Sequence, residues 1–381
     1  MYPNLYYAFK DIFGWDLPGL KFLNSFGFFV AISFLVAAWV LTKELRRKQQ
    51  QGLFEHTEET IAIGAPASAS ELLLNFVLGF IFGYKIIGAF MVPGALDDPQ
   101  AFLLSGKGSL LLGVLLGALF AGVRWWEKNK QKLDKPEIRT VRIWPHDRVG
   151  DIVILAFVFG FLGAKIFHNL ENWGDFVKDP VGSLISFSGL TFYGGLICAG
   201  IAIIYYSKKK KIKVIHLADA MAPALMLAYA IGRIGCQVSG DGDWGIANIK
   251  PKPFSWLPDW LWSYRYPHNV INEGVPMRGC IGQYCNQLSF PVYPTPLYET
   301  IMCLILFFVL WGVRKRIRLA GQISGLYLVF NGMERFFIEH IRVNTHYDFL
   351  PFKPTQAELI SVLLVLAGVV LLTQSKKWFN K

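Results

Sequence analysis

The chain has 381 residues, of which 53% are hydrophobic, 15% aromatic and 17% charged. A soluble domain usually carries about 25% charged residues, and an apolar excess of this size does not fit inside one soluble core. Disorder is excluded because it requires low hydrophobicity and high charge. The net charge of +11 falls in short clusters between apolar runs, which favours membrane orientation over nucleic-acid binding. The composition therefore predicts a polytopic membrane protein.

Nine apolar segments are long enough for a membrane-spanning helix, which requires about 20 residues. In chain order they are 22–42, 71–91, 108–125, 149–169, 188–206, 214–235, 297–313, 320–340 and 357–374. The runs are continuous rather than alternating, which argues against spanning strands. We therefore expect an all-α integral membrane protein whose residues 1–381 form a single membrane domain.

Basic clusters between these segments predict the orientation. The clusters are Lys43–Lys48, Arg124–Arg148, Lys208–Lys213, Arg314–Arg318 and Lys376–Lys381. With nine spans all of them fall on one side, which the positive-inside bias assigns to the cytoplasm. We therefore expect a cytoplasmic C-terminus, with the N-terminus outside. The loops expected outside are 92–107, 170–187, 236–296 and 341–356.

The first two pairs of predicted helices after residue 70 resemble each other. The eight residues from Gly108 align without gaps on the eight from Gly189, and Asp98-Pro99 aligns on Asp179-Pro180. With one residue of slippage, Lys85 also aligns on Lys165. The segment 71–125 is therefore interpreted as a hairpin duplicated from 149–206. Tyr193-Gly194-Gly195 in the second copy replaces Leu-Gly-Val in the first.

Ionisable residues inside predicted spans are functional candidates because a charge at mid-bilayer costs roughly 2.5–3.5 kcal/mol. Arg233 lies near the end of 214–235, between two glycines, and Arg335, Glu339 and Arg342 share one helical face. An internal ion pair and snorkelling to the headgroups are the alternative explanations. All three arginines reach the outer side, where they are suited to binding one phosphate.

The segment after Arg233 is rich in glycine and contains Asp241 and Asp243. Irregular backbone at membrane depth is tolerated only when it is buried in protein or faces a wet cavity. No histidine or further carboxylate stands at metal-ligand spacing, so we expect no metal site there. Further along, Cys280 and Cys285 lie in the predicted outside loop, where a disulfide is expected in an oxidising compartment.

Several of these elements together resemble the prolipoprotein diacylglyceryl transferase family. The elements are Gly232-Arg233-Ile-Gly235, Ser239-Gly240-Asp241, Trp244-Gly245, Pro294-Thr-Pro-Leu-Tyr-Glu299, Tyr193-Gly194-Gly195-Leu196, Phe26-Gly27, and Ser324-Gly325-Leu326 through Arg335-x-x-x-Glu339-x-x-Arg342. The resemblance covers roughly 22–48 and 149–374. The segment 71–125 and most of the loop 246–296 are additional to it.

Four positions depart from the family pattern. They are Phe26 for Tyr, Tyr193 for His, Cys236 for Asn and Asp241 for Glu, with Asp243 as a competing match for that Glu. Arg233 and Arg335, the two arginines on which the family relies most, are retained.

The resemblance implies a transferase of the bacterial cytoplasmic (inner) membrane with its active site on the outer side. It would move the diacylglyceryl group of phosphatidylglycerol to the lipobox cysteine of a preprolipoprotein, forming a thioether and releasing glycerol-1-phosphate. The expected partners are phosphatidylglycerol, lipobox signal peptides and the bilayer. No nucleic acid, metal or organic cofactor is expected.

The implied roles fall into two sets. Catalysis is expected from Arg233, Arg335, Glu339, Tyr193 and Asp241. Phosphatidylglycerol binding is expected from Arg233, Arg335, Arg342, Gly194, Gly195, Cys236, Gly245 and Phe26. Glu339 and Asp241 are both candidate bases for the thiol, whereas tyrosine, with an ordinary pKa near 10, suits hydrogen bonding.

Two other functions use the same residues. A transporter of anionic solute or lipid would use the arginines as a binding site between repeated hairpins. A non-catalytic homologue would bind lipid or lipoprotein precursor without transferring the diacylglyceryl group, as the departures at Phe26 and Tyr193 suggest.

Overall fold

The computed structural model consists of two compact units. The first contains Met1–Asp16, Leu23–Glu55 and Ile212–Lys381, and the second contains Leu17–Phe22 and His56–Lys211. The structure describes residues 1–96, 98–186, 189–344, 347 and 353–379. Ser188 of the predicted span 188–206, Lys381 of the tail cluster, and 345–346 and 348–352 of the predicted loop 341–356 lie outside the described residues.

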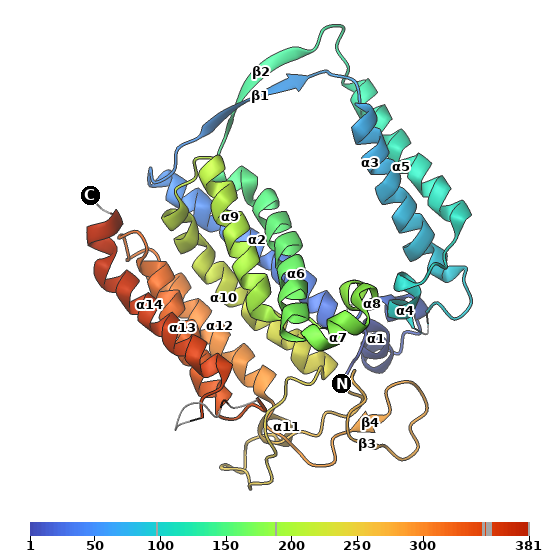
Figure 1. Ribbon diagram of the computed structural model, residues 1–381, viewed down its shortest axis with the longest axis vertical. Helices are drawn as coiled ribbons and strands as arrows, with labels where there is room; N and C mark the ends of the chain where they lie inside the picture. Colours follow the sequence, from blue (N-terminus) through green and yellow to red (C-terminus); the bar gives the residue numbers. More distant parts are fainter. Residues whose placement is uncertain (97, 187–188, 345–346, 348–352, 380–381) are drawn as a thin grey trace. The chain divides into compact units, whose positions relative to one another are not determined.

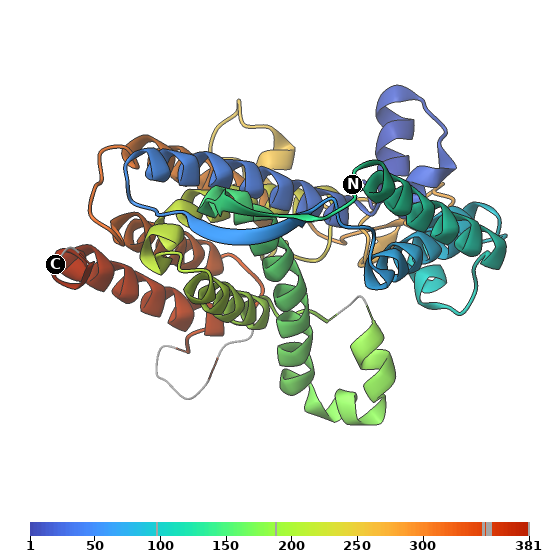
Figure 2. The same cartoon turned by 90° about the horizontal axis from the view of Figure 1, so that it is seen from above.

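Long helices form most of the first unit. They are α1 (Leu5–Phe13), α2 (Ser25–Gln50), α10 (Val214–Ser239), α12 (Thr295–Val313), α13 (Gln322–Glu339) and α14 (Gln356–Phe379). α10 packs against α2, α12 and α13, and α13 packs against α14 (Figures 1 and 2). α10 is therefore the helix around which this unit is built.

Small residues allow these helices to approach closely. A Cβ at Gly325 would lie 2.9 Å from the carbonyl oxygen of Gly368, and a Cβ at Gly368 would lie 2.6 Å from that of Gly325. A Cβ at Gly235 would lie 3.3 Å from the Cα of Phe26, at the contact of α10 with α2. Helices in lipid associate through such close packing because lipid tails are as apolar as their side chains.

A buried aspartate fixes the start of α13 to α10. Asp219 accepts hydrogen bonds from the backbone N–H of Gly321 and of Ser324, each at 2.9 Å, and from the Ser324 hydroxyl at 2.8 Å. Lys48 of α2 lies 3.5 Å from the same carboxylate. A carboxylate at a helix N-terminus satisfies N–H groups that lack partners within the helix, so Asp219 connects three helices.

The segment between α10 and α12 forms a small folded cap on the first unit. It contains α11 (Asp259–Trp262) and two short antiparallel strands, β3 (Val275–Pro276) and β4 (Asn286–Gln287). The predicted disulfide joins Cys280 to Cys285 between these strands. The segment has its own apolar core of Trp244, Tyr266, Leu288 and Val292.

The second unit contains two helical hairpins. The first has α3 (Ala69–Ile81), a π-helical turn η2 (Phe82–Ile87), η3 (Gly88–Phe90), α4 (Pro99–Leu104) and α5 (Leu110–Lys130). The other has α6 (Val149–Glu171), α7 (Trp173–Lys178), α8 (Pro180–Ile185) and α9 (Phe192–Lys209). α3 packs on α5, and α6 packs on α9.

The two hairpins share local details in their connecting segments. The side chains of Asp98 and Asp179 cap α4 and α8, and each is followed by a proline in the first turn. The Lys85 ammonium donates to backbone carbonyls in the loop after α4, including that of Ser105. Lys165 donates to the carbonyl of Ser186, after α8, at 2.8 Å. Both lysines therefore attach a short helix to the preceding long one.

A two-stranded antiparallel ribbon follows the first-unit helix α2 along the chain. β1 (Thr57–Ile63) pairs with β2 (Glu137–Ile143), with Thr57 opposite Ile143 (Figures 1 and 2). Glu59 of β1 binds Arg148 of the 3-10 turn η4 (Pro145–Arg148) at 2.6 Å and Lys210 at 2.7 Å. This ribbon was not predicted from the sequence.

A further 3-10 turn, η1 (Pro18–Phe22), belongs to the same unit.

Each of the nine predicted spans falls on a helix, and seven helices of the described residues are long and apolar enough to cross a membrane. These seven are Ser25–Gln50, Ala69–Phe90, Leu110–Lys130, Pro145–Glu171, Val214–Ser239, Thr295–Val313 and Gln356–Trp378. The other two predicted spans are the shorter helices α9 and α13. α9 ends in two lysines, and α13 carries Glu334, Arg335 and Glu339. The chain is therefore an all-α polytopic membrane protein.

Candidate active site

Arg233 lies in the last turns of α10, with its guanidinium against two carboxylates. It forms ion pairs with Glu299 of α12 and with Asp243, in the loop that follows α10. Its guanidinium carbon lies 5.2 Å from the centre of the Tyr229 ring, one turn earlier. The glycine after it, at 235, allows α2 to pack close to this part of α10.

α13 contributes the second predicted arginine. Arg335 binds Glu339 across one helical turn at 2.9 Å, as their i, i+4 spacing predicts. The same guanidinium lies 3.7 Å from Glu299. Glu339 also accepts a hydrogen bond from the Asn344 side chain, so it holds both Arg335 and the segment that follows α13.

Arg342 completes the cluster from the segment after α13. Its Nη1 donates to Glu299 at 2.9 Å, and its Nη2 donates to Asp243 at 2.7 Å. Arg233, Arg335 and Arg342 therefore meet at one place, although α10 is distant in sequence from α13 and the segment that follows it.

Glu299 is the residue on which these arginines converge, and it was not predicted from the sequence as a site residue. Its side chain is completely buried and accepts a further hydrogen bond from the Tyr229 hydroxyl at 2.9 Å. The sequence did contain a signal for Glu299 as a functional residue, because it is an ionisable residue inside the predicted span 297–313. A buried carboxylate is stable only when it is paired and hydrogen-bonded, and Glu299 has both kinds of partner.

The glycine-rich loop after α10 places Asp243 between two of the arginines. Gly240 and Gly242 have positive φ angles of 64° and 100°, which glycine adopts without strain. A Cβ at Gly245 would collide with the carbonyl oxygen of Ile341, next to Arg342. Gly245 is therefore needed for the close backbone approach that brings Arg342 to Asp243.

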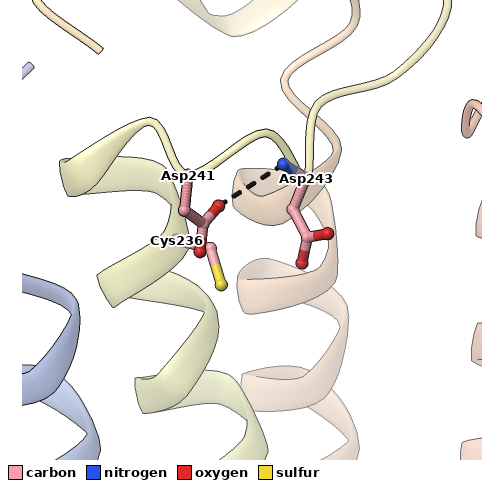
Figure 3. A group of neighbouring side chains, drawn as sticks. All are labelled: Cys236, Asp241 and Asp243. Atoms are coloured by element: carbon pink, nitrogen blue, oxygen red, sulfur yellow. Dashed lines mark hydrogen bonds between the residues drawn. The ribbon is translucent and has the colours of Figure 1, made fainter. Parts of the chain in front are cut away.

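Cys236, Asp241 and Asp243 lie together at the end of α10, as Figure 3 shows. Their potential ligand atoms lie within 4.8 Å of one another. The Arg233 Nη1 lies 3.6 Å from the Cys236 sulfur and also binds Asp243. Because Asp243 is already neutralised by two guanidinium groups, this group of side chains is poorly suited to a metal ion.

The two aspartates of this loop differ in their electrostatic surroundings. Burial would raise the pKa of Asp243, but Arg233 and Arg342 hold that pKa at about 2. Burial and the neighbouring Asp243 raise the pKa of Asp241 above its usual range. Asp241 is therefore the more basic of the two carboxylates.

An apolar groove of about 390 Å³ opens between α12 and α13. Its lining residues are Tyr298, Ile301, Met302, Phe337, Ile338 and Ile341. Tyr298 immediately precedes Glu299, and Ile338 immediately precedes Glu339. The groove and the charged cluster therefore lie at the same level of both helices.

The remaining predicted residues lie on α2 and α9. Phe26 is in the first turn of α2, and its backbone contacts Gly235. Tyr193, Gly194 and Gly195 are in the first turn of α9, in the second unit. A Cβ at Gly195 would lie 2.8 Å from the carbonyl oxygen of Gly160, and one at Gly194 would collide with Phe167. This glycine pair therefore allows α9 to pack on α6.

The residues of this cluster lie in a part of the chain that matches a known protein family. The model of the prolipoprotein diacylglyceryl transferase family matches residues 108–374. The chain belongs to this family. The match begins just before α5 and ends within α14, so it contains Arg233, Asp243, Glu299 and both arginines contributed by α13 and its following segment.

Curated members of the family extend this match. The chain is 25% identical to the phosphatidylglycerol–prolipoprotein diacylglyceryl transferase of Leptospira interrogans over 406 aligned positions, which cover 99% of this chain and 95% of that protein. It is 26% identical to the enzyme of the same name from Buchnera aphidicola, covering 73% of this chain and 96% of that protein. The Clostridium novyi enzyme is 28% identical over 60% of this chain and 80% of its own length.

Proposed function

We propose that this protein transfers the diacylglyceryl group of phosphatidylglycerol to the lipobox cysteine thiol of a preprolipoprotein. Membership of the prolipoprotein diacylglyceryl transferase family supports this function. The observation that carries it within this chain is the convergence of Arg233, Arg335 and Arg342 on one buried carboxylate. Three guanidinium groups at one place are suited to a phosphate ester.

The reaction breaks one bond and forms another at the same carbon. The cysteine sulfur bonds to the terminal glycerol carbon of the diacylglyceryl group, and the bond from that carbon to the phosphate oxygen breaks. The electron pair leaves with glycerol-1-phosphate, and the thiol proton passes to a base. The protein must stabilise charge on the leaving phosphate, which is often the largest contribution to catalysis.

The three guanidinium groups are neutralised by Glu299, Glu339 and Asp243. A phosphodiester reaching the arginines must therefore replace one carboxylate. Glu299 and Glu339 have completely buried side chains, whereas the Asp243 side chain is 36% exposed. We infer that the lipid phosphate takes the place of Asp243 between Arg233 and Arg342.

This replacement also supplies a base near the thiol. Asp243 is held at a low pKa by the two arginines, so its separation from them raises its basicity. It then joins Asp241 and Glu339 as a candidate acceptor of the thiol proton. Tyr193 would hydrogen-bond the headgroup, and Cys236, Gly245 and Phe26 would shape the lipid site.

The apolar groove is suited to an acyl chain of the same lipid. Its lining side chains come from α12, α13 and the segment directly after α13, and its one hydroxyl belongs to Tyr298. A lipid whose phosphate lies at the arginine cluster would then extend an acyl chain between these helices. The groove volume of about 390 Å³ is enough for part of one chain.

In the membrane we propose nine spanning helices, with the N-terminus outside and the C-terminus in the cytoplasm of a bacterial cell. Residues 1–381 would form one membrane domain, with 71–125 a duplicate of 149–206 and 246–296 an extracytoplasmic loop. The Asp-capped short helices and the lysine contacts shared by the two hairpins support the duplication. The active site would then face the outer side.

Transfer is tested with purified protein in phosphatidylglycerol vesicles and a lipobox peptide, read by mass spectrometry. We expect diacylglyceryl addition to cysteine, and a decrease of about 10²-fold or more in Arg233→Ala and in Arg335→Ala. Arg316→Ala, in the basic segment after α12, is the matched control and should retain activity. Full activity in both site variants would place the anion site elsewhere.

The same assay separates the alternative functions. A non-catalytic homologue would bind phosphatidylglycerol without modifying the peptide. A transporter would move labelled lipid or anion across sealed vesicles without forming a thioether. Either result with folded wild-type protein would overturn the proposed transfer.

A further inference from the structure

The loop between Asn248 and Ser263 exposes aromatic side chains that the proposed reaction does not use. Phe254, Trp256 and Trp260 are 56%, 74% and 54% exposed. The rings of Phe254 and Trp256 are stacked, with their centres 5.5 Å apart. Large exposed apolar side chains gathered on one loop usually mark an interaction surface.

The ends of this loop are closed by hydrogen bonds, so the exposure belongs to the fold. The Asn248 side chain donates to the carbonyl of Trp262 at 2.6 Å, and the Ser263 hydroxyl donates to the carbonyl of Asn248 at 2.9 Å. Across the loop, the Trp262 indole N–H donates to the carbonyl of Lys250 at 3.0 Å. These bonds hold the two ends of the loop together, and the exposed aromatic side chains lie between them.

The loop is attached to the end of a membrane-spanning helix. The Tyr298 hydroxyl, in the first turn of α12, donates to the carbonyl of Leu261 at 2.7 Å. The rings of Trp262 and Tyr293 are also in edge contact, with centres 5.5 Å apart. α11 lies at the same end of the first unit as the start of α12 (Figure 1). With α12 as a spanning helix, the loop would lie at the depth where α12 enters the lipid headgroups.

The chemistry of the loop fits that depth. Tryptophan is enriched at membrane–water interfaces because its ring is apolar and its N–H is polar. Lys250 and Lys252 are exposed beside the aromatic residues, and lysines attract anionic lipid surfaces. Lys252 also pairs with Asp259 at 2.8 Å, whereas Lys250 has no acidic partner among the residues that the structure describes.

We propose that Phe254, Trp256 and Trp260 insert into the headgroup region of the leaflet at the start of α12. In the proposed orientation this is the outer leaflet. Tyr298 contacts the loop and also lines the apolar groove. The inserted loop therefore lies beside the groove. A lipid of that leaflet would enter the groove from the same side. The insertion rests on α12 as a spanning helix and does not depend on transferase activity.

Spin-label accessibility of the full-length protein in vesicles of phosphatidylcholine and phosphatidylglycerol tests the insertion. Labels are attached at Trp256→Cys and at Trp260→Cys in a Cys198→Ser background, since the other free cysteines are buried. Ile305→Cys, exposed on α12, is the lipid reference, and Glu273→Cys, exposed near β3, is the aqueous reference. Collisions with oxygen report lipid, and collisions with a water-soluble nickel complex report water.

We expect the oxygen-to-nickel collision ratio at both tryptophan positions to lie closer to that of Ile305→Cys than to that of Glu273→Cys. A ratio equal to that of Glu273→Cys would overturn the insertion. A ratio that rises only when a lipobox peptide is added would assign the loop to peptide docking, which also overturns it.

A kinetic measurement then tests the consequence for lipid entry. Trp256→Ser combined with Trp260→Ser should raise the KM for vesicle phosphatidylglycerol by about tenfold, with kcat unchanged. Phe290→Ser, which removes an exposed aromatic side chain elsewhere in the same segment, should leave both constants unchanged. An equal KM in all three proteins would show that the loop has no part in lipid entry. An inactive wild-type protein would contradict the proposed transfer but not the insertion, because the collision ratios are measured without turnover.

Discussion

The charges of the site are balanced residue by residue, and this balance determines how a substrate can bind. Arg233 and Arg342 share both Asp243 and Glu299. Removing one partner of a buried ion pair is costly, because the other charge is left unpaired. A substrate phosphate that replaces Asp243 avoids this cost, since it brings a negative charge to the same two guanidinium groups.

Asp243→Asn tests this competition directly. Without the competing carboxylate, the dissociation constant for glycerol-1-phosphate should fall about tenfold, equivalent to about 1.4 kcal/mol, as measured by calorimetry on the detergent-solubilised protein. Transfer should slow at the same time if the displaced carboxylate accepts the thiol proton. The matched control is Asp241→Asn, which removes a carboxylate from the same loop and should leave anion affinity unchanged. Weaker anion binding in Asp243→Asn would mean that Asp243 orients the arginines and is not replaced.

At the scale of residues, the sequence identified the arginines of the site but not the carboxylate that binds them. Arg233, Arg335 and Glu339 were identified because a charge inside an apolar run is conspicuous. Glu299 is equally conspicuous, but only coordinates show that it binds all three arginines. Gly194 was expected in the phosphatidylglycerol site, and the structure shows that a Cβ at this position would also collide with Phe167. A sequence pattern does not distinguish these two uses of glycine.

At the scale of elements, the contact between α13 and α14 determines where Arg335 and Glu339 stand. The helices approach through Gly325 and Gly368, each of which faces the backbone of the other. A methyl group at either position must push the helices apart. Overpacking of this kind costs about 1–3 kcal/mol.

Gly325→Ala should therefore lower the unfolding temperature of the purified protein and reduce transfer, because α13 carries two residues of the site. The control is Gly312→Ala on α12, where an added Cβ meets no atom within 4 Å. That substitution should be neutral or slightly stabilising, since alanine favours helix over glycine by about 1 kcal/mol. Equal unfolding temperatures in the two variants would contradict the close packing of α13 on α14.

The long helices were predictable as elements, and the strands were not. An apolar run of about 20 residues identifies a spanning helix without knowledge of its neighbours. β1 and β2 are separated by a whole hairpin, and most of their residues are exposed. No local pattern indicates that such segments pair, because their stability comes from a partner distant in sequence.

At the scale of the whole molecule, the number of spans determines the side on which the site lies. Within the described part of the chain, seven helices meet the length and hydropathy expected of a span, and α9 and α13 are the two additional spans of the nine-helix proposal. α13 has fewer apolar residues because it carries the charged residues of the site. A helix that contributes ionic side chains to a buried cluster need not be apolar throughout, since those charges are paired within the protein.

Nine spans and seven spans predict opposite sides for two segments. From an outside N-terminus, nine spans place Glu273 outside and Lys315 in the cytoplasm. Omitting α9 and α13 places Glu273 in the cytoplasm and Lys315 outside. Asp175, between α6 and α9, is outside in both arrangements and serves as the positive control.

Single cysteines at these three positions, treated with a membrane-impermeant maleimide on intact spheroplasts, separate the arrangements. We expect labelling at Glu273→Cys and Asp175→Cys in intact spheroplasts, and at Lys315→Cys only after permeabilisation. The positive-inside bias gives the same result, because Lys315 belongs to the basic cluster Arg314–Arg318. Labelling of Lys315→Cys in intact spheroplasts would place that cluster outside. Asp243 binds Arg233 and Arg342 and lies in the same segment between α10 and α12 as Glu273. The arginine cluster would then face the cytoplasm, away from secreted lipobox substrates.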